Sequence, residues 1–257
     1  MSTLSDVTIL ITTFLRDGYL FTCLNRLESN LPECKIMVVD DGYVSVEKAS
    51  LAPKIDYQSM PFDSGLSAKR NVGLKKCQTK YLLLGCDDFD FGTPEAKTGI
   101  LKLIEMLDTY QVDVASGRVN NYTYEGFIEY KPGDYFRQYF PKDKHDGPPA
   151  QIGGAILCDI TINYYLIRID SMRNMLWDEK MKIGGEHGEW FLSLKEADKK
   201  VVWVPGVNIT SLDLGKTPNV QDPAYDQYRD RAISLGHRLF KEKRNIKTFI
   251  TFTGGII

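Results

Sequence analysis

Short apolar runs alternate with amphipathic stretches through the first half of the chain. Three runs of β-branched and aliphatic residues are typical of strands buried on both faces: residues 7–11, 34–39 and 80–84. Apolar residues recur at helical spacing from Leu20 to Leu27, and Thr93-Pro94 is a strong start for a helix over 94–109. The alternation predicts an α/β fold with a mainly parallel sheet flanked by helices.

The second half lacks this regular alternation. Residues 120–131 predict a hairpin around Glu125-Gly126, and the Gly-, Pro- and charge-rich stretch 141–154 is a candidate mobile lid. The other expected elements are an extended stretch over 155–168, a short helix over 170–176, a helix opening within 184–191, a strand over 200–204 and a long helix over 224–243. Residues 248–257 alternate like an edge strand, which could pair within the domain or with a second copy in a homo-oligomer.

Polar clusters follow three of the predicted strands where each strand ends. They are Thr12-Thr13-Phe14-Leu15-Arg16, Asp40-Asp41 and Asp87-Asp88-Phe89-Asp90. Because ligands bind beyond the carboxyl ends of parallel strands, we expect these clusters to line one crevice. In an extended segment Asp88 and Asp90 share a face, and a hard divalent cation would relieve their repulsion. The alternative is a solvated acidic turn before a helix.

Two arginines are placed to meet an anion. Arg16 lies near a strand end, and Arg70 lies at a predicted helix start, whose free N–H groups favour phosphate. Asp40 and Asp41 can accept hydrogen bonds from ribose hydroxyls or a pyrimidine N–H, although loop aspartates more often bind nearby backbone N–H groups. The combination favours a nucleotide diphosphate held by a metal and one or two arginines.

A second acidic pair, Glu186 and Glu189, lies beside His187 in a glycine-rich segment. A carboxylate in a partly dry pocket suits removal of a proton from an acceptor hydroxyl, with Glu186 as the first candidate base. Both glutamates would also stabilise a helix N-terminus, and a lone histidine is more often structural. Trp177 and Trp190 could offer a sugar an apolar face, although core packing is the commoner use of tryptophan.

Composition bears on the binding partners and the cellular compartment of the protein. A net charge of −2 gives no general attraction for polyanions, so a nucleic acid would have to be met locally, for example by the basic run 241–247. The cysteine count, five, is odd and without metal-ligand spacing, which indicates a reducing compartment. No apolar run approaches membrane-spanning length. We therefore expect a cytoplasmic protein.

The ordered set of motifs resembles metal-dependent nucleotide-sugar glycosyltransferases of the GT-A fold, in the family-two-like group. The branch it is most similar to contains the β-1,4-N-acetylgalactosaminyltransferases that build ganglioside-type glycans. The similar pieces span most of the chain and are residues 7–16, 37–41, 70–71, 79–84 with the Asp-rich turn, 163–166, 177–182 and 186–191. Each piece alone is weak, and the order makes the set specific.

The resemblance implies inverting transfer of GalNAc, GlcNAc, Gal or Glc from a UDP-sugar, with Mn²⁺ or Mg²⁺, to a hydroxyl on a glycan or other biomolecule. It implies one domain over 1–257, with a Rossmann-like donor half over 1–118, an acceptor half over 119–222 and a C-terminal helix and tail. Around the nucleotide it places Thr12, Thr13, Phe14, Arg16, Asp40, Asp41, Arg70 and Asp87. On the metal it places Asp88 with Asp87 or Asp90, and at the acceptor the Glu186–Glu189 loop with the base. Trp177 and Trp190, which flank that loop in the sequence, are the candidate acceptor-binding residues.

The chain departs from the family pattern at two places. Where relatives have three consecutive acids, it has Cys86 before Asp87 and Phe89 between Asp88 and Asp90. Where many relatives place a metal-binding histidine after the late strand, it offers Ser211 and Asp213. Two alternatives stay open. One is transfer of a sugar onto hydroxymethylated bases of DNA, and the other is a non-catalytic module that binds nucleotide sugars or glycans.

Overall fold

A computed structural model describes residues 1–51, 55–120, 126–143, 147–214 and 220–257. In chain order the elements are η1 Leu4–Asp6, β1 Val7–Thr13, α1 Asp17–Asn30, β2 Lys35–Asp40, α2 Val46–Ala49, β3 Asp56–Ser59, α3 Leu66–Lys76, β4 Tyr81–Cys86, α4 Pro94–Thr109, β5 Val114–Val119, β6 Phe127–Lys131, β7 Tyr135–Tyr139, η2 Pro141–Asp143, β8 Gln151–Ile152, β9 Ala155–Cys158, β10 Tyr165–Arg168, α5 Ile169–Met172, α6 Glu186–Glu196, β11 Val201–Ile209, α7 Tyr225–Arg244 and β12 Thr248–Ile250.

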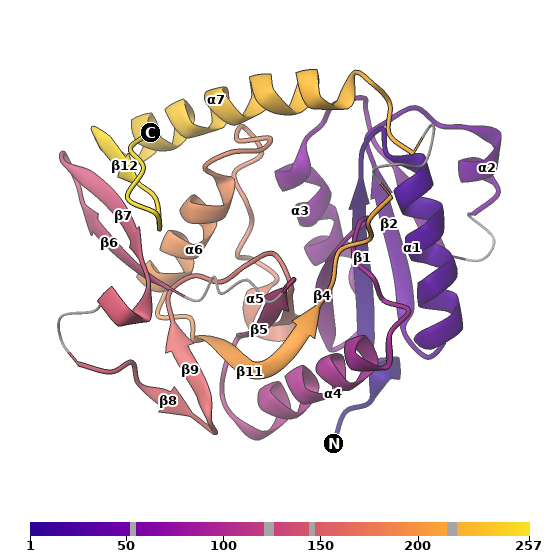
Figure 1. Ribbon diagram of the computed structural model, residues 1–257, viewed down its shortest axis with the longest axis horizontal. Helices are drawn as coiled ribbons and strands as arrows, with labels where there is room; N and C mark the ends of the chain where they lie inside the picture. The colour runs from indigo at the N-terminus through magenta and orange to yellow at the C-terminus, as the bar shows by residue number, and fades with distance from the viewer. Residues whose placement is uncertain (52–54, 121–125, 144–146, 215–219) are drawn as a thin grey trace.

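Within these described residues a nine-stranded sheet runs through the molecule in the order β3-β2-β1-β4-β10-β5-β11-β9-β8 (Figure 1). The strands β3, β2, β1 and β4 are parallel, and β10 is inserted antiparallel between β4 and β5. A smaller sheet contains β12, β7 and β6. The mainly parallel α/β fold predicted from the alternating pattern is confirmed, with the antiparallel strands confined to the second half.

The central sheet is covered on both faces, which explains its uninterrupted apolar strands. Ile9 and Ile11 of β1 belong to a core with α1 and α4, whereas Leu10 belongs to a second core with α3 and α6. All seven residues of β1 are buried. Successive side chains of a strand point to opposite faces, so a strand with helices on both sides buries all of its side chains and is mostly apolar.

The hairpin predicted over 120–131 stays a prediction. Residues 121–125, including Glu125, lie outside the described residues, and the observed hairpin joins β6 to β7. Its turn contains Gly133, whose φ of 81° favours glycine. The stretch 141–154 contains η2 and β8, which pairs with β9. The predicted helices of the second half are present within a few residues of the expected bounds, as α5, α6 and α7. The extended stretch predicted over 155–168 is two strands, β9 and β10, the strand predicted over 200–204 is the start of β11, and the edge strand predicted over 248–257 is limited to β12.

The helix α7 runs across the top of Figure 1, above α3 and α6. Its buried residue Phe240 packs against Phe136 of β7 and Phe249 of β12, with ring centroids 4.9 and 5.6 Å away. The helix therefore joins the small sheet to the carboxyl ends of the parallel strands. All five cysteines lie in the described residues and are free thiols. Across the described ranges, no helix combines the length and the hydropathy needed to cross a bilayer. The compartment and self-association stay predictions.

Candidate active site

A cavity of about 270 Å³ opens beyond the carboxyl ends of β1, β2 and β4. The parallel register sets Thr13 beside Asp40 and Thr12 beside Cys86, so the three strand ends lie side by side. Of the residues predicted to bind nucleotide or metal, those lining this cavity are Thr12, Thr13, Phe14, Arg16, Asp41, Asp87 and Asp88. We call it the donor cavity. The prediction of one crevice shared by separate strand ends is confirmed.

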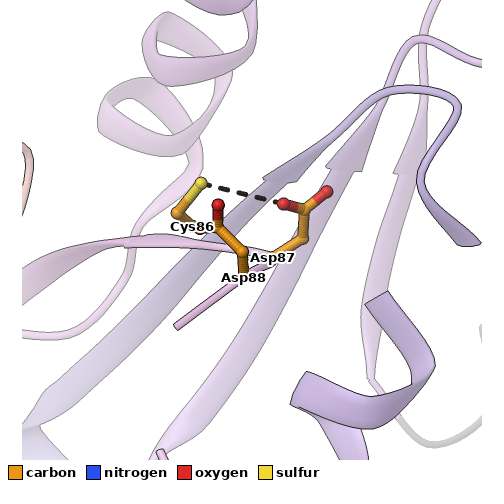
Figure 2. Close-up of side chains that lie close together, drawn as sticks. All are labelled: Cys86, Asp87 and Asp88. Carbon is orange, nitrogen blue, oxygen red and sulfur yellow. Dashed lines mark hydrogen bonds between the residues drawn. The ribbon is translucent and has the colours of Figure 1, made fainter. Parts of the chain in front are cut away.

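The acidic turn after β4 faces the donor cavity with two carboxylates. Figure 2 shows the side chains of Cys86, Asp87 and Asp88 gathered together. One possible ligand atom from each residue lies within 4.8 Å of the others. Thr13 Oγ1 and Arg16 Nη1 each donate to Asp87 at 2.8 Å, and Arg16 Nη2 donates to Asp88 at 3.1 Å. Burial raises the pKa of Asp87 to about 6, and Arg16 opposes that rise.

This donor set suits a hard divalent cation. Burial and the two neighbouring carboxylates raise the pKa of the Cys86 thiol, which leaves the oxygens of Asp87 and Asp88 as the anionic ligands. In the structure the positive charge of Arg16 balances them. Two oxygen ligands beside an open cavity are what Mg²⁺ or Mn²⁺ needs when substrate oxygens complete its shell.

Asp90 lies away from this pair, so the predicted sharing of one face by Asp88 and Asp90 is wrong. The strand ends at Cys86 and the chain turns at 87–88, so the two-residue period of an extended segment does not apply. The Asp90 carboxylate accepts from Arg26 and from the Gly92 amide at 3.0 Å. The chain after β11 also fixes this turn, because Ser211 forms a β-bridge with Phe89.

The two aspartates after β2 have different roles. Asp41 lines the donor cavity, pairs with Lys69 and accepts from the Gly65 amide at 2.7 Å. Asp40 is fully buried and is absent from the cavity wall; it accepts from Tyr57 Oη at 2.8 Å and pairs with Lys48 at 2.9 Å. The predicted nucleotide contact of Asp40 is therefore wrong, because its oxygens already have partners inside the protein.

One face of α7 roofs the donor cavity, which the sequence prediction missed. Its members are Tyr225, Tyr228, Arg229 and Ala232. Tyr228 packs on Phe14 at 5.6 Å between ring centroids, and the Arg16 guanidinium lies 5.4 Å from the Tyr225 ring. The sequence did contain one indication of this face, because the four residues have the i, i+3, i+4, i+7 spacing of one side of a helix. That spacing does not say what the side covers.

A second cavity of about 550 Å³ adjoins the first, and we call it the acceptor cavity. The two share Leu66, Asn163, Ile183 and Arg229 in their walls. The rest of the acceptor cavity is lined by the start of α6, by α7 and by the segment 249–257, with Glu186 and His187 among the lining residues. A group held in one cavity thus lies next to a group held in the other.

Glu186 is a buried carboxylate at the wall of the acceptor cavity. Burial raises its pKa, while Arg70 and the backbone N–H groups at the start of α6 oppose the rise. His187 Nε2 contacts the Thr161 carbonyl at 2.6 Å, and burial, aided by Arg70, lowers the pKa of His187 to about 3. The histidine is therefore neutral at physiological pH and a weak base. His237 also lines the cavity but is only half-buried, so Glu186 is the buried group there that is suited to take up a proton.

A pair of glycines sets the entry to α6. Gly184 and Gly185 have φ values of 83° and 80°, which side-chain-bearing residues rarely adopt. A β-carbon on Gly184 would lie 2.6 Å from the main chain of Ile233, and one on Gly185 would lie 2.9 Å from the Gly236 carbonyl oxygen. The loop before Glu186 is thus packed directly against the backbone of α7.

Comparison with known proteins decides the family. The model of glycosyl transferase family 2 matches residues 8–163, which is more than half of the chain. The chain belongs to glycosyl transferase family 2. It is 30% identical over 190 residues to β-1,4 N-acetylgalactosaminyltransferase 2 of Mus musculus, and 28% identical over 193 residues to β-1,4 N-acetylgalactosaminyltransferase 1 of Homo sapiens. Each alignment covers 72% of this chain and 35% of the relative, so the chain spans about a third of their length.

Solved structures show that this family 2 chain has the GT-A fold. The crystal structure of GalNAc-T7 with UDP, GalNAc and Mn²⁺ superposes with a TM-score of 0.60 at 13% identity, covering 94% of this chain and 55% of that one. A mannosyltransferase from Pyrobaculum calidifontis in complex with GDP-Man and Mn²⁺ gives a TM-score of 0.52 at 11% identity, covering 80% and 56%. At these identities the likeness concerns the fold.

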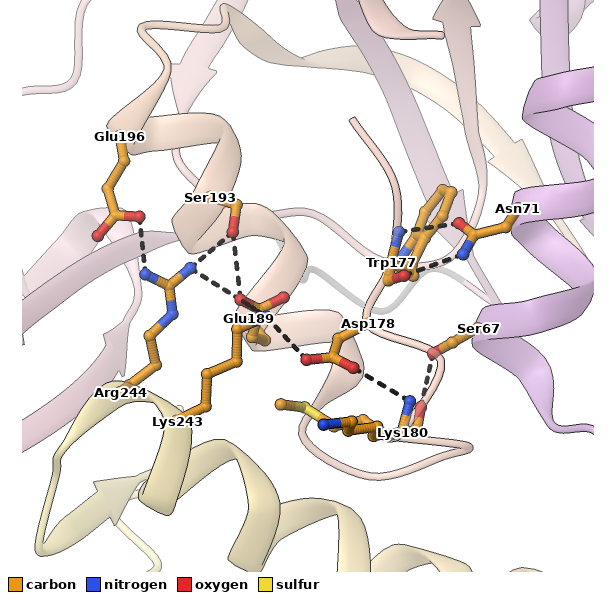
Figure 3. A network of polar contacts seen from close by, with 11 residues as sticks. Ser67, Asn71, Trp177, Asp178, Lys180, Glu189, Ser193, Glu196, Lys243 and Arg244 are labelled. Carbon is orange, nitrogen blue, oxygen red and sulfur yellow. Dashed lines mark hydrogen bonds and ion pairs between the residues drawn. The ribbon is translucent and has the colours of Figure 1, made fainter. Parts of the chain in front are cut away.

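Glu189, the second candidate base of this family 2 chain, is a structural residue. Figure 3 shows Lys243 and Arg244 of α7 reaching toward its carboxylate. Their nitrogen atoms lie 3.0 and 2.8 Å from Glu189 Oε1. Arg244 also pairs with Glu196, and Lys243 with Asp178. The prediction that Glu189 acts as a base is wrong, because its carboxylate holds α6 against α7 and lines neither cavity. These ion pairs engage Lys243 and Arg244 of the basic run 241–247, two of the cations that could have followed the phosphates of DNA.

The two tryptophans and Arg70 also lie elsewhere than predicted. Trp177 and Trp190 are 2% and 0% exposed and stack on each other with centroids 4.1 Å apart. They belong to the core, so they offer no face to an acceptor, and the acceptor-binding prediction for them is wrong. Arg70 lines neither cavity and pairs with Glu186 at 3.7 Å, so its predicted contact with the nucleotide is also wrong.

Proposed function

We propose that the chain is a metal-dependent, inverting glycosyltransferase that moves a sugar from a UDP-sugar to a hydroxyl of a glycan or another biomolecule. One observation carries the proposal: the Asp87–Asp88 pair and the buried carboxylate of Glu186 line two cavities that share a wall. The relatives named as N-acetylgalactosaminyltransferases support GalNAc as the first sugar to test, and the neighbours with UDP, GDP-Man and Mn²⁺ support a nucleotide-sugar donor and a metal.

On the donor side, Asp87 and Asp88 would hold Mn²⁺ or Mg²⁺, which when bound would neutralise charge on the leaving diphosphate. Arg16 would move from these carboxylates to the phosphates, since both of its present partners would then face the metal. Arg229 has no ion pair among the described residues and stands in the wall common to both cavities, where it adds a second cation. Phe14 and Tyr228 offer ring faces to the base or ribose.

On the acceptor side, Glu186 takes the proton of the acceptor hydroxyl as that oxygen attacks the anomeric carbon. The bond from the anomeric carbon to the diphosphate oxygen breaks, and its electron pair leaves with the nucleotide. Attack from the side opposite the diphosphate inverts the configuration at that carbon. The shared wall of the cavities allows this in-line arrangement, because donor and acceptor then lie on opposite sides of one carbon.

The test is a transfer reaction with UDP-GalNAc, Mn²⁺ and a set of acceptor glycosides, with UDP-GlcNAc, UDP-Gal, UDP-Glc and GDP-mannose as alternative donors. We expect a product carrying one added sugar from one UDP-sugar, a β-linkage by proton NMR, and loss of turnover when a chelator is added. An α-linked product would contradict inversion. Turnover at full rate in the chelator would contradict the metal.

A further inference from the structure

The buried ion pair between Arg70 and Glu186 is unusually incomplete. Each residue is 5% exposed, and Arg70 Nη1 lies 3.7 Å from Glu186 Oε1, too far for a strong hydrogen bond. Arg70 Nη1 has no hydrogen-bond partner among the described residues. The Arg70 side chain comes from the fifth residue of α3 and the Glu186 side chain from the first residue of α6, about 115 positions further along the chain. The attraction between them is therefore one of charge, and the carboxylate, which also accepts from backbone N–H groups at the start of α6, is not held in a close ion pair.

The guanidinium of Arg70 is held from its other side by the aromatic core. It lies 5.5 Å from the ring of Trp177, which stacks on Trp190, which in turn stacks on Tyr165 at 5.7 Å. Asn71 fixes the Trp177 backbone with two hydrogen bonds of 2.9 Å, visible in Figure 3. A cation resting on a rigid ring stack has little freedom to swing toward the donor cavity.

The charged and titratable groups around Glu186 come from several elements. His187 is neutral, and Tyr165 of β10 is held un-ionised because burial raises its pKa. Arg229 and His237 of α7 line the same cavity, while Lys243 and Arg244 are engaged with Glu189. In the described part of the chain, Arg70 is thus the cation that forms an ion pair with Glu186.

We propose that Arg70 is a positioning residue for Glu186. It holds the Glu186 carboxylate at the wall of the acceptor cavity, and its positive charge sets how readily that carboxylate binds a proton. The inference rests on the proposed function, because it takes Glu186 as the base. It makes two claims: the charge of Arg70 governs proton binding by Glu186, and Arg70 does not bind the nucleotide. An opposite charge a few ångströms away lowers the pKa of a carboxylate by about 1–3 units.

The direct test compares the unfolding equilibrium of four proteins across pH: wild type, Glu186→Gln, Arg70→Met and the double variant. An acid whose pKa is raised by folding loses stability as pH rises through its folded-state pKa, by up to tenfold in the equilibrium constant per pH unit. The loss of stability that depends on Glu186 is the difference between a protein with Glu186 and the matching protein with Glu186→Gln. This loss should extend about 1–3 pH units higher when Arg70→Met is compared with the double variant than when wild type is compared with Glu186→Gln. Equal end points for the two pairs would overturn the proposal.

Two controls keep the result decisive. Arg70→Lys keeps the charge, so its Glu186-dependent loss should end closer to the wild-type pH than that of Arg70→Met. Affinity for UDP with Mn²⁺ should change by less than about threefold in Arg70→Met; a drop of tenfold or more would make Arg70 a donor ligand. If Arg70→Met does not fold, the double variant should fold, since it leaves no unpaired buried charge, and a double variant equally unfolded would overturn the proposal.

Activity separates this inference from the proposed function. In an active enzyme, Arg70→Met should raise the pH of the acidic limb of kcat/KM by about 1–3 units and recover rate at high pH, with KM for the donor unchanged. If no donor and acceptor pair reacts, the proposed function fails, while the unfolding comparison still decides whether Arg70 controls Glu186.

Discussion

The carboxylates on the donor side of the cleft and the carboxylate on the acceptor side differ in how closely a cation is paired with them. On the donor side each carboxylate facing the cavity has a close cation, with Arg16 at 2.8 Å from Asp87 and Lys69 on Asp41. On the acceptor side Glu186 has a cation at 3.7 Å and faces a cavity. Close pairing suits carboxylates that will exchange one cation for another, whereas loose pairing suits a carboxylate that must accept a proton.

The largest effect should come from removing charge on the donor side. Asp88→Asn should reduce turnover by at least about 10³-fold, because it removes an anionic ligand at the point where diphosphate charge is balanced. Asp90→Asn is the matched control, since its carboxylate faces Arg26, and its turnover should fall by less than about tenfold. Steady-state kinetics with circular dichroism checks both. Equal losses in two folded variants would place Asp90 at the metal.

Removing the loosely paired carboxylate should have the next largest effect. Glu186→Gln should lower kcat by about 10²–10³-fold with little change in donor KM, because an amide cannot take up the acceptor's proton. Kinetics at saturating acceptor measure this. A variant within a few-fold of the wild-type kcat would show that the base lies elsewhere, and the contrast between the two sides would then fail.

Glu189→Gln should affect stability more than chemistry. It removes the anion shared by Lys243 and Arg244 at a site 2% exposed, so unfolding should become easier by about 1–3 kcal/mol. Denaturant titration gives the loss, and kcat should fall far less than in Glu186→Gln. The reverse order, with intact stability and lost kcat, would exchange the roles of the two glutamates.

At neutral pH the smallest effect concerns His187, whose pKa of about 3 lies below its ordinary value of 6.5. The folded state binds a proton less readily than the unfolded state, so stability is lost as pH falls below 6.5 and the loss continues toward 3. The wild type should lose about 1 kcal/mol per pH unit more than His187→Gln over this range. Parallel stability curves for the two proteins would mean that the histidine is solvated.

The sequence predicted the donor side of the cleft better than the acceptor side. The donor side follows from local pattern: each strand is a short apolar run, each ends at a polar cluster, and parallel strands bring those ends together. Thr13, Arg16 and Asp87 could therefore be placed without knowing any long-range contact. The error over Asp90 was also local, because a turn at 87–88 replaced the extended chain assumed there.

The acceptor side depends on contacts between distant segments, which a pattern does not reveal. A tryptophan in the core and a tryptophan beside a sugar have the same sequence signal, so Trp177 and Trp190 could not be assigned. From the sequence, Arg70 had the features of a phosphate ligand. In the structure its guanidinium lies over the ring of Trp177 and pairs with Glu186. The roof formed by Tyr225 and Tyr228 lies more than 200 positions from Phe14, which it contacts.

The most direct test of the central claim is a thermal-shift panel of UDP-, GDP-, dTDP- and CMP-sugars, each with and without Mn²⁺, on the wild type and on Asp88→Asn. A ligand that binds the folded state at 100 times its Kd stabilises it by about 2.7 kcal/mol. We predict a shift from one UDP-sugar in wild type with Mn²⁺, and its loss in Asp88→Asn or without the metal. No shift from any donor, in a folded protein, would contradict the account.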